Sequence, residues 1–555
     1  METKVSHSPR TLITAMVVAA IPALLAALIG EDIFQTWDLV TAAAVLIGGL
    51  LLIFLRGSQT PMHLASMSLA MLILVVPTAY VHIRFDAPVS NDERSYLYQA
   101  EVFSEGKLAD PVQVHEWVDY SLRQRQVHEN RDVDRRYSKY SPATSLGLTP
   151  GVWLGWPPLM VILAGIADLL LIAMIGRRFG LDKPRLAALV LATSPFFLLV
   201  QSSFQSEVFT MPAALAGYWA LLKSRQNPKG GPGFSAFLVG MCAGWIFLGR
   251  PLTGVVYAAA MALGLWFGPG APKWRGLFSA ILGGLPLLVI ALAYNRAQTG
   301  DWLLSPYEVY AQAFGPWENP QAAAADRIPI DVYGNGNFFQ GMLRQLGRWG
   351  VAFGGMLGAA GIAWWGLWAN RRRDGGAGAV FALLLPAAYA LHWYPGHWGY
   401  LGPLYCIESL GMLVVGFLMC LQGAPKAWRN NLILAVIAWG AILFVVRLVP
   451  LQEQVNRRAL PERVAAQMEE HSVLLLPYFK NPAMAEPTMK YWTPSRNPAG
   501  QRVAIVRELP EPDLTARVLR ALELQERPVF RLTPDETASD GSGYSAQPVE
   551  LPAIE

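Results

Sequence analysis

The chain has 555 residues, of which 53% are hydrophobic and 15% are charged, whereas soluble domains carry roughly 25% charged residues. Its formal net charge is only +4, which argues against nucleic acid as a partner. Apolar runs of about 18 residues or more recur along most of the chain, each long enough to cross the hydrocarbon of a bilayer as a helix. This pattern disfavours a soluble multidomain protein and predicts an all-α polytopic membrane protein.

Reading the chain from the N-terminus for such runs predicts about thirteen transmembrane helices. We place them near residues 12–30, 38–55, 63–82, 153–176, 184–201, 206–222, 234–249, 251–268, 275–295, 346–369, 377–394, 403–421 and 431–449. The first run follows Lys4 and Arg10 but lacks a small-x-small cleavage site, so we interpret it as a retained helix rather than a signal peptide.

The distribution of Lys and Arg predicts which loops face the cytoplasm. With the N-terminus inside, the predicted cytoplasmic loops carry the basic residues Arg56, Arg177, Arg178, Lys183, Arg185, Lys223, Arg225, Lys229, Lys273, Arg275, Arg371, Arg372, Arg373, Lys426 and Arg429. An odd number of crossings then places loops 83–152 and 296–345 and the tail from residue 450 outside. None of these outer segments contains an N-x-Ser/Thr sequon, which favours a bacterial inner membrane.

We therefore expect a transmembrane domain over 1–449, followed by a change of character in the C-terminal tail. Short hydrophobic stretches and one amphipathic run predict a small periplasmic α/β appendage over 450–532. The stretches are Val473–Leu476, Val503–Val506 and Val529–Leu532, with the amphipathic run at Leu514–Leu524. Residues 533–555 are rich in Asp, Ser, Gly and Pro, a composition typical of disorder.

The first outer loop opens with adjacent acidic residues, Asp92 and Glu93. Tyr96, Ala100 and Phe103 follow at helical spacing, so this segment is predicted to form an amphipathic helix at the membrane surface. Carboxylates there lie within reach of a lipid headgroup. A purely structural interpretation stays open, because Ser90 with Glu93 matches a capping box.

The same loop closes with a basic and aromatic stretch over residues 135–142, whose cations suit either anionic headgroups or a phosphodiester leaving group. Further polar residues lie at predicted membrane depth, where each needs a partner or a cavity. They are Asp168, Glu207, Arg250, His392, His397 and Glu408. The outer aromatic residues, Tyr307 and Tyr310 among them, suit either stacking on a sugar or isoprenoid or the interfacial belt of membrane proteins, and we favour the belt for most of them.

Several short motifs resemble, in order, those of the GT-C glycosyltransferases of family 39 type, the protein O-mannosyltransferase and aminoarabinose transferase branch. They are Asn91-Asp92-Glu93 with Tyr96, Ala100 and Gly106; Tyr137-Ser138-Lys139-Tyr140-Ser141-Pro142; Ser194-Pro195-Phe196-Phe197; Arg250-Pro251-Leu252-Thr253; Tyr294-Asn295; and Gly399-Tyr400-Leu401-Gly402-Pro403 with Glu408. The resemblance implies a GT-C type helix bundle with surface helices in its first outer loop, and a polyprenyl-phosphate-linked sugar as donor.

The resemblance also implies roles for individual residues. Asp92 is the candidate general base, with Glu93 beside it. The candidate ligands of the donor phosphate are Lys139, Arg94 and Arg250, and the candidate cavity and acceptor residues are Glu207, Tyr137, Tyr140 and Glu408.

Charge placement then predicts the chemistry: a carboxylate removes the acceptor hydroxyl proton while cations stabilise the departing lipid phosphate. A single displacement inverts the anomeric carbon. The three cysteines lie in apolar runs and no metal-ligand spacing appears, so we expect no cofactor and no obligatory metal. Two other classes stay open, a transporter or flippase of lipid-linked sugar and a non-catalytic envelope scaffold in which the acid pair only caps a helix.

Overall fold

The computed structural model describes residue 70, residues 72–75, 78, 88, 90–112, 118, 126–225, 233–268, 273–314, 359–373, 375–390, 404–477, 498–534 and 544–552. These residues fall into two compact units. The first comprises described residues within 1–81, 141–293 and 314–450, and the second those within 82–140, 294–313 and 451–555. The predicted helices near 12–30 and 38–55 lie outside the described residues.

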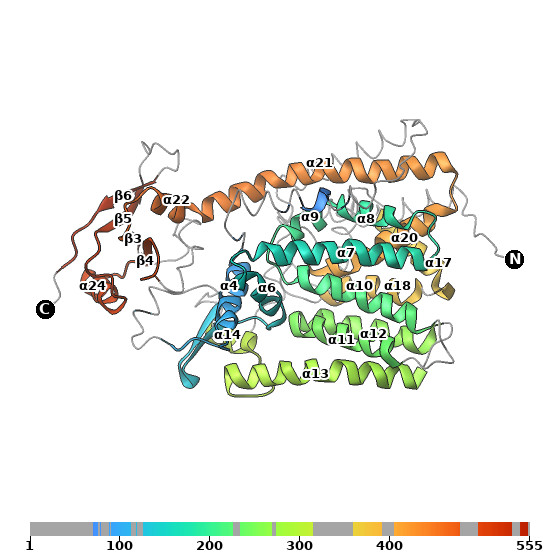
Figure 1. Cartoon of the computed structure of the whole chain (residues 1–555), viewed down its shortest axis with the longest axis horizontal. Coiled ribbons are helices and arrows are strands. Elements are labelled where there is room, and N and C mark those ends of the chain that lie inside the picture. Colours follow the sequence, from blue (N-terminus) through green and yellow to red (C-terminus); the bar gives the residue numbers. More distant parts are fainter. Residues whose placement is uncertain are drawn as a thin grey trace. The chain divides into compact units, whose positions relative to one another are not determined.

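The first unit is a bundle of apolar helices (Figure 1). Its elements are α6 (Ala143–Trp153), α7 (Pro158–Arg178), α8 (Pro184–Ala192), α9 (Pro195–Gln201), α10 (Glu207–Ser224), α11 (Gly233–Gly249), α12 (Pro251–Phe267), most of α13 (Lys273–Thr299), α17 (Ala359–Ala369), η3 (Arg371–Arg373), α18 (Gly375–Ala390), η4 (Leu404–Ser409), α20 (Leu410–Gln422) and most of α21 (Lys426–Arg458). Helix α10 packs between α7 and α11, α12 lies against α11 and α18, and α17 against α20.

The described part of the bundle has the length and apolarity of a multi-pass membrane protein. Four described helices are long and apolar enough to span a bilayer: Pro158–Arg178, Lys273–Thr299, Leu404–Gln422 and Lys426–Phe444. Shorter apolar helices are α11, α12 and α18. Helix α13 exposes a continuous apolar surface, with Phe278, Ile281, Leu285 and Val289 all at the surface of the chain, as expected of a helix that faces lipid.

Small residues let some of these helices approach closely. A Cβ on Gly240 of α11 would collide with the backbone of Ala280 in α13, and one on Gly366 of α17 would collide with Gly416 in α20. Close backbone contact of this kind is typical of membrane helix pairs, whose association depends on van der Waals packing.

The boundaries of the predicted helices agree closely with those observed in the middle of the chain, with one correction. The run 184–201, predicted as one helix, is two helices, α8 and α9, bent by 70°. Helix α9 begins at Pro195, whose ring cannot continue the preceding helix. By contrast, the interruption predicted at Arg250 and Pro251 does separate α11 from α12.

The second unit joins three segments that are distant in sequence. It contains α4 (Asn91–Ser104), β1 (Val127–Asn130), η1 (Arg131–Val133), β2 (Arg135–Ser138), α14 (Pro306–Phe314, to residue 313), α22 (Leu460–Ala466), β3 (Ser472–Leu476), β4 (Val503–Arg507), α24 (Pro512–Ala521), β5 (Val529–Pro534) and β6 (Tyr544–Pro548). Strands β1 and β2 form an antiparallel hairpin that pairs Val127 with Ser138.

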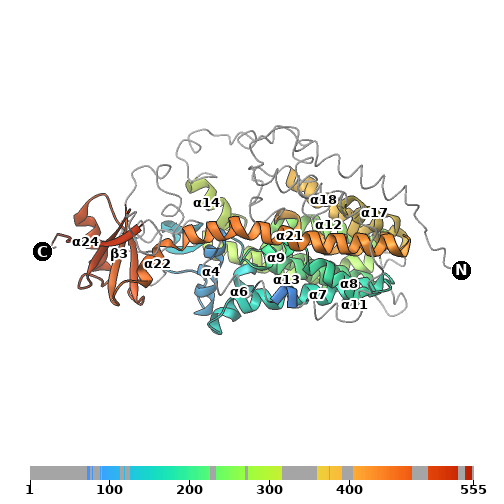
Figure 2. The same cartoon turned by 90° about the horizontal axis from the view of Figure 1, so that it is seen from above.

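The C-terminal segment contains a sheet with the helices α22 and α24 beside it (Figure 2). The sheet has four strands in the order β4-β3-β5-β6, and β3 is parallel to β4 and β5. Alternate residues of β3 point to opposite faces. Leu474 packs in one core with Leu460 and Val464 of α22, while Val473 packs in another with Val518 of α24. The sheet is therefore covered by a helix on each face. Strand β6, antiparallel to β5, lies where the sequence predicted disorder, so that prediction is wrong for residues 544–548.

Candidate functional site

The acidic motif occupies the first turn of α4, where its two carboxylates have different surroundings. Ser90 is the N-cap: its Oγ accepts a hydrogen bond from the Glu93 N–H at 3.3 Å and donates one to Glu93 Oε1 at 3.0 Å. Glu93 is 1% exposed. Ser90 thus caps the helix as the structural alternative from the sequence predicted, and the Glu93 carboxylate accepts from the Ser90 hydroxyl.

Asp92 instead faces a group of tyrosines. The Tyr140 hydroxyl donates a hydrogen bond to the Asp92 carboxylate, and burial together with that carboxylate raises the pKa of Tyr140 well above its usual range. The Tyr96 ring, one turn after Asp92, lies 4.7 Å from the ring of Tyr140. Burial and Asp92 also raise the pKa of Tyr307 to about 12. Both tyrosines therefore stay protonated at neutral pH, as neutral neighbours of the Asp92 carboxylate.

The β1–β2 hairpin brings the basic motif to the same helix. Ser95 of α4 lies 2.7 Å from the Ser138 Oγ, and Gln99 Oε1 accepts a hydrogen bond from the Ser138 backbone N–H at 2.9 Å. The next residue, Lys139, donates its backbone N–H to Gln126 at 2.9 Å. These contacts hold the end of β2 against α4. The pairing of the two strands therefore fixes the positions of Lys139 and Tyr140, which come directly after β2.

The Lys139 ammonium lies over three aromatic rings. Its Nζ is 5.1 Å from the ring centroid of Tyr140, 4.9 Å from that of Tyr307 and 4.5 Å from that of Tyr310. Lys139 is 7% exposed, and attraction between a cation and aromatic faces strengthens as water is excluded. Tyr140 and Tyr307 thus link the cation to Asp92, and residues from α4, the hairpin and α14 form one group.

Two other residues predicted for this site have different partners. Tyr137 is fully buried and accepts a hydrogen bond from the Asn130 side chain at 3.2 Å within the hairpin; burial raises its pKa. Arg94 directs its guanidinium to Glu462 of α22, with both terminal nitrogens 3.3 Å from Glu462 Oε1. In this structure Tyr137 supports the hairpin and Arg94 forms an ion pair.

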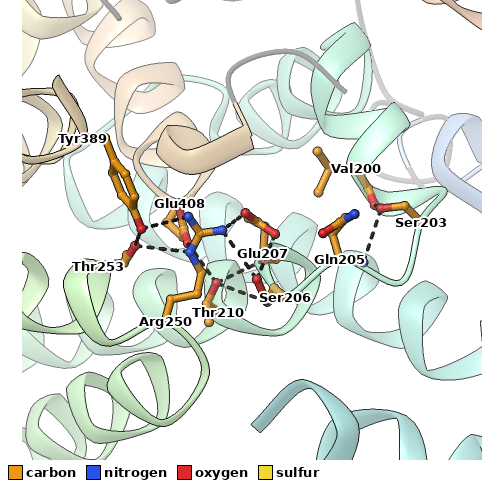
Figure 3. Close-up of polar contacts among 10 residues, drawn as sticks. All are labelled: Val200, Ser203, Gln205, Ser206, Glu207, Thr210, Arg250, Thr253, Tyr389 and Glu408. Carbon is orange, nitrogen blue, oxygen red and sulfur yellow. Dashed lines mark hydrogen bonds and ion pairs between the residues drawn. The ribbon is translucent and has the colours of Figure 1, made fainter. Parts of the chain in front are cut away.

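The remaining predicted residues form a separate buried cluster in the helix bundle (Figure 3). Arg250, the residue before α12, pairs with Glu207 at the start of α10 and with Glu408 of η4, the latter at 3.2 Å. The Arg250 guanidinium is also 2.9 Å from the Tyr389 hydroxyl. The Thr210 hydroxyl donates a hydrogen bond to Glu408 at 3.0 Å. One cation thus meets two carboxylates.

This Arg250 cluster, defined by Arg250, Glu207 and Glu408, lies in the first unit, whereas the Asp92–Lys139 group lies in the second. The predicted residues therefore form two groups, one in each unit. Asp168 belongs to neither: it is fully buried and accepts a hydrogen bond from Gln201 at 3.1 Å. His392 and His397 lie outside the described residues.

Sequence reasoning missed some members of these groups. Tyr307 and Tyr310 were assigned to the interfacial belt, but their spacing on α14 lets both reach Lys139. Tyr389 and Glu462 gave no signal, because only the fold brings them to the arginines. Thr253 belongs to the motif that begins at Arg250, but the sequence gave it no role; its hydroxyl lies 3.3 Å from the Arg250 Nε. Among the described residues, no group of His, Cys, Asp and Glu is arranged to hold a metal ion.

No family model and no curated protein matches this sequence. Similar solved structures include ArnT from Cupriavidus metallidurans bound to undecaprenyl phosphate, with 13% identity over 85% of this chain and 94% of that chain and a TM-score of 0.49. Another is AglB, an oligosaccharyltransferase from Archaeoglobus fulgidus, in complex with an inhibitory peptide and a dolichol-phosphate; it has 11% identity over 85% of this chain and 69% of that chain and a TM-score of 0.39. At these identities and scores the likeness carries no argument about substrate or mechanism.

Proposed function

We propose that this protein is an inverting glycosyltransferase, which moves a sugar from a polyprenyl-phosphate carrier to an acceptor hydroxyl at the outer face of the membrane. The observation that carries the proposal is the grouping of Asp92 and Lys139 around Tyr140 and Tyr307. A base and a cation in one group are what a displacement at a sugar phosphate requires.

In this mechanism the Asp92 carboxylate accepts the proton of the acceptor hydroxyl as the oxygen attacks the anomeric carbon. The bond from that carbon to the phosphate oxygen breaks, and its electron pair leaves with the lipid phosphate. Lys139 stabilises the negative charge that develops there. Because phosphate leaves without a proton donor, a second carboxylic acid is not needed, and one displacement inverts the anomeric carbon.

Of the three cations predicted to bind the donor phosphate, we assign the role to Lys139, because it shares Tyr140 and Tyr307 as neighbours with Asp92. Arg94 and Arg250 each form ion pairs with glutamates, and these carboxylates compete with a phosphate for the guanidinium. Tyr140 orients Asp92 through its hydrogen bond. We assign Glu207 and Glu408 a structural role, because both carboxylates pair with Arg250 inside the helix bundle.

The test is transfer of labelled sugar from a panel of polyprenyl-phosphate donors by the purified protein. Asp92→Asn is expected to lower kcat by about 100-fold or more, since a positioned general base contributes about 10²–10⁴-fold. Lys139→Ala is expected to lower kcat by about 100-fold, the loss typical of a group that stabilises developing negative charge. Glu101→Gln, an exposed acid on the same helix α4, is the matched control and should keep wild-type activity.

Each variant must elute as a single species in detergent before its rate is compared. Full activity of Asp92→Asn would overturn the assignment of the base. A wild-type protein that binds donors without turnover would instead support the transporter or scaffold alternatives. Analysis of the product's anomeric configuration tests inversion independently of the mutants, because a single back-side displacement inverts the anomeric carbon.

A further inference from the structure

The C-terminal segment reaches the acidic motif through one ion pair. Both terminal nitrogens of Arg94 lie 3.3 Å from Glu462 Oε1, with the Arg94 side chain 13% exposed and that of Glu462 41% exposed. Arg94 is two residues after Asp92, in the same first turn of α4. The pair therefore joins α22 to the turn that carries the proposed base.

Arg94 also closes that turn through its backbone. Its N–H donates to the Ser90 carbonyl at 3.3 Å, which is the first hydrogen bond of the helical ladder. The first turn of a helix is otherwise its least supported part, because its N–H groups have no partner within the helix. Fixing the Arg94 side chain from outside consequently restrains the backbone on which Asp92 sits.

Glu462 is well placed to act as an anchor, because α22 belongs to the hydrophobic core of the C-terminal sheet. Leu460 and Val464, on either side of Glu462, pack with Leu474 of β3 and Ile505 of β4. Pro461 stands in the first turn of α22, where its fixed φ favours helix initiation. The carboxylate thus projects from a helix end supported by the sheet, whereas a loop residue would lack that support.

We propose that Glu462 is a positioning residue, which acts through Arg94 to hold Asp92 in the orientation set by Tyr140. The proposal rests on the proposed function, and it gives the C-terminal segment an indirect part in the reaction, through Arg94. Because Glu462 restrains the base, and the donor phosphate is bound by Lys139, its loss should lower kcat and leave the donor KM unchanged.

The experiment compares Glu462→Gln, Arg94→Gln and the double variant with the wild-type protein. Each single variant is expected to lower kcat about three- to fivefold, the range for a partly exposed ion pair worth up to about 1 kcal/mol. The double variant should be no slower than either single one, because both remove the same contact. Glu462→Asp should recover part of the rate.

The matched control is Glu508→Gln. It breaks the ion pair between Glu508 and Arg531 in the same C-terminal sheet, which does not involve α4, and should keep wild-type kcat. A second readout is hydrogen exchange of the α4 amides from Glu93 to Tyr96. Their exchange should be faster in Glu462→Gln than in the wild type and unchanged in Glu508→Gln.

A wild-type kcat in Glu462→Gln overturns the proposal. Additive effects of the two single variants also overturn it, because the two residues would then act independently. A raised donor KM in Arg94→Gln alone overturns it as well, because Arg94 would then be a phosphate ligand. If the wild type transfers no sugar from any donor, the proposed function fails first. Unchanged hydrogen exchange of α4 in Glu462→Gln would then show that the ion pair does not restrain α4 either. Faster exchange would show that the ion pair restrains α4, but its role in catalysis would fall with the proposed function.

Discussion

Asp92 and Glu93 are adjacent in sequence but differ in what surrounds them. Glu93 exchanges hydrogen bonds with Ser90 and is buried, whereas Asp92 accepts from Tyr140 beside the Lys139 ammonium. The difference follows from helical geometry, which turns successive side chains by about 100°. Asp92 is thus the carboxylate that we propose as the base, and Glu93 stabilises the helix that carries it.

The capping role of Ser90 can be measured as stability. Ser90→Ala is expected to lower the free energy of unfolding by about 1 kcal/mol, because the Glu93 N–H loses its acceptor. Thermal unfolding of the purified protein in detergent reports this as a lower midpoint. Ser104→Ala, in the last turn of the same helix, is the control with a similar change in volume. Equal midpoints for wild type and Ser90→Ala would show that the cap contributes nothing.

At this scale the sequence predicted single residues better than their partners. The spacing in the first outer loop indicated a helix opening at Asp92, and Lys139 came from the motif before the chain returns to the membrane. Neither pattern predicted that Tyr307 and Tyr310 would surround Lys139, because that contact depends on how α14 packs within the second unit. Tertiary contacts between distant segments leave no periodic signal in a single sequence.

The Arg250 cluster connects elements that are distant along the chain. Arg250 precedes α12, Glu207 begins α10, Tyr389 lies near the end of α18 and Glu408 belongs to η4. All of these side chains are buried, with exposures of at most 7%. Charges in such a place are stable only with partners of opposite sign, so the cluster holds these elements together as a set.

Arg250→Met should therefore destabilise the protein by about 3–5 kcal/mol, because it leaves two buried carboxylates without their cation. Unfolding in increasing denaturant measures the loss, and Arg372→Met, which alters an exposed arginine of η3, is the control. The triple variant Arg250→Met, Glu207→Gln and Glu408→Gln should recover much of the stability. If Arg250→Met were as stable as the wild type, the cluster would not be an energetic link between these elements.

Elements were predictable from sequence where apolar runs had clear ends. Pro251 after Arg250 marked the start of α12, and the hydrophobic stretches of the tail coincide with β3, β4 and β5. The break between α8 and α9 was missed because hydropathy alone is continuous from residue 184 to 201, although Pro195 was visible in the sequence. Strand β6 was missed because its polar residues form a strand only by pairing with β5.

For the molecule as a whole, the basic loops predict which side of the membrane each segment occupies. We expect Asp132, exposed in the hairpin, and Glu511, exposed before α24, to lie outside, and Lys183, exposed before α8, to lie in the cytoplasm. Single cysteines at these positions, in a variant without the native cysteines, test this with an impermeant maleimide on intact cells. Asp132→Cys and Glu511→Cys should be labelled, and Lys183→Cys should react only after lysis.

Labelling of Lys183→Cys from outside would reverse the predicted topology, and the outer-face location of the proposed reaction with it. The location in a bacterial inner membrane is also a proposal. The labelling experiment tests it when the protein is produced in a bacterial host. The composition predicted helices long and apolar enough to span a bilayer, and the described part of the chain contains four of them.

The second unit is built from residues within 82–140, 294–313 and 451–555, so its parts leave the ribosome at very different times. Asp92 and Lys139 are synthesised early, the tyrosines of α14 midway, and Glu462 only after all the predicted membrane helices. The proposed active site and its positioning residue are therefore complete only after residue 462 has been synthesised. A nascent chain that ends before α14 carries the base and the cation but lacks the rings of Tyr307 and Tyr310 and the carboxylate of Glu462. We therefore expect activity only after all the predicted membrane helices have been synthesised.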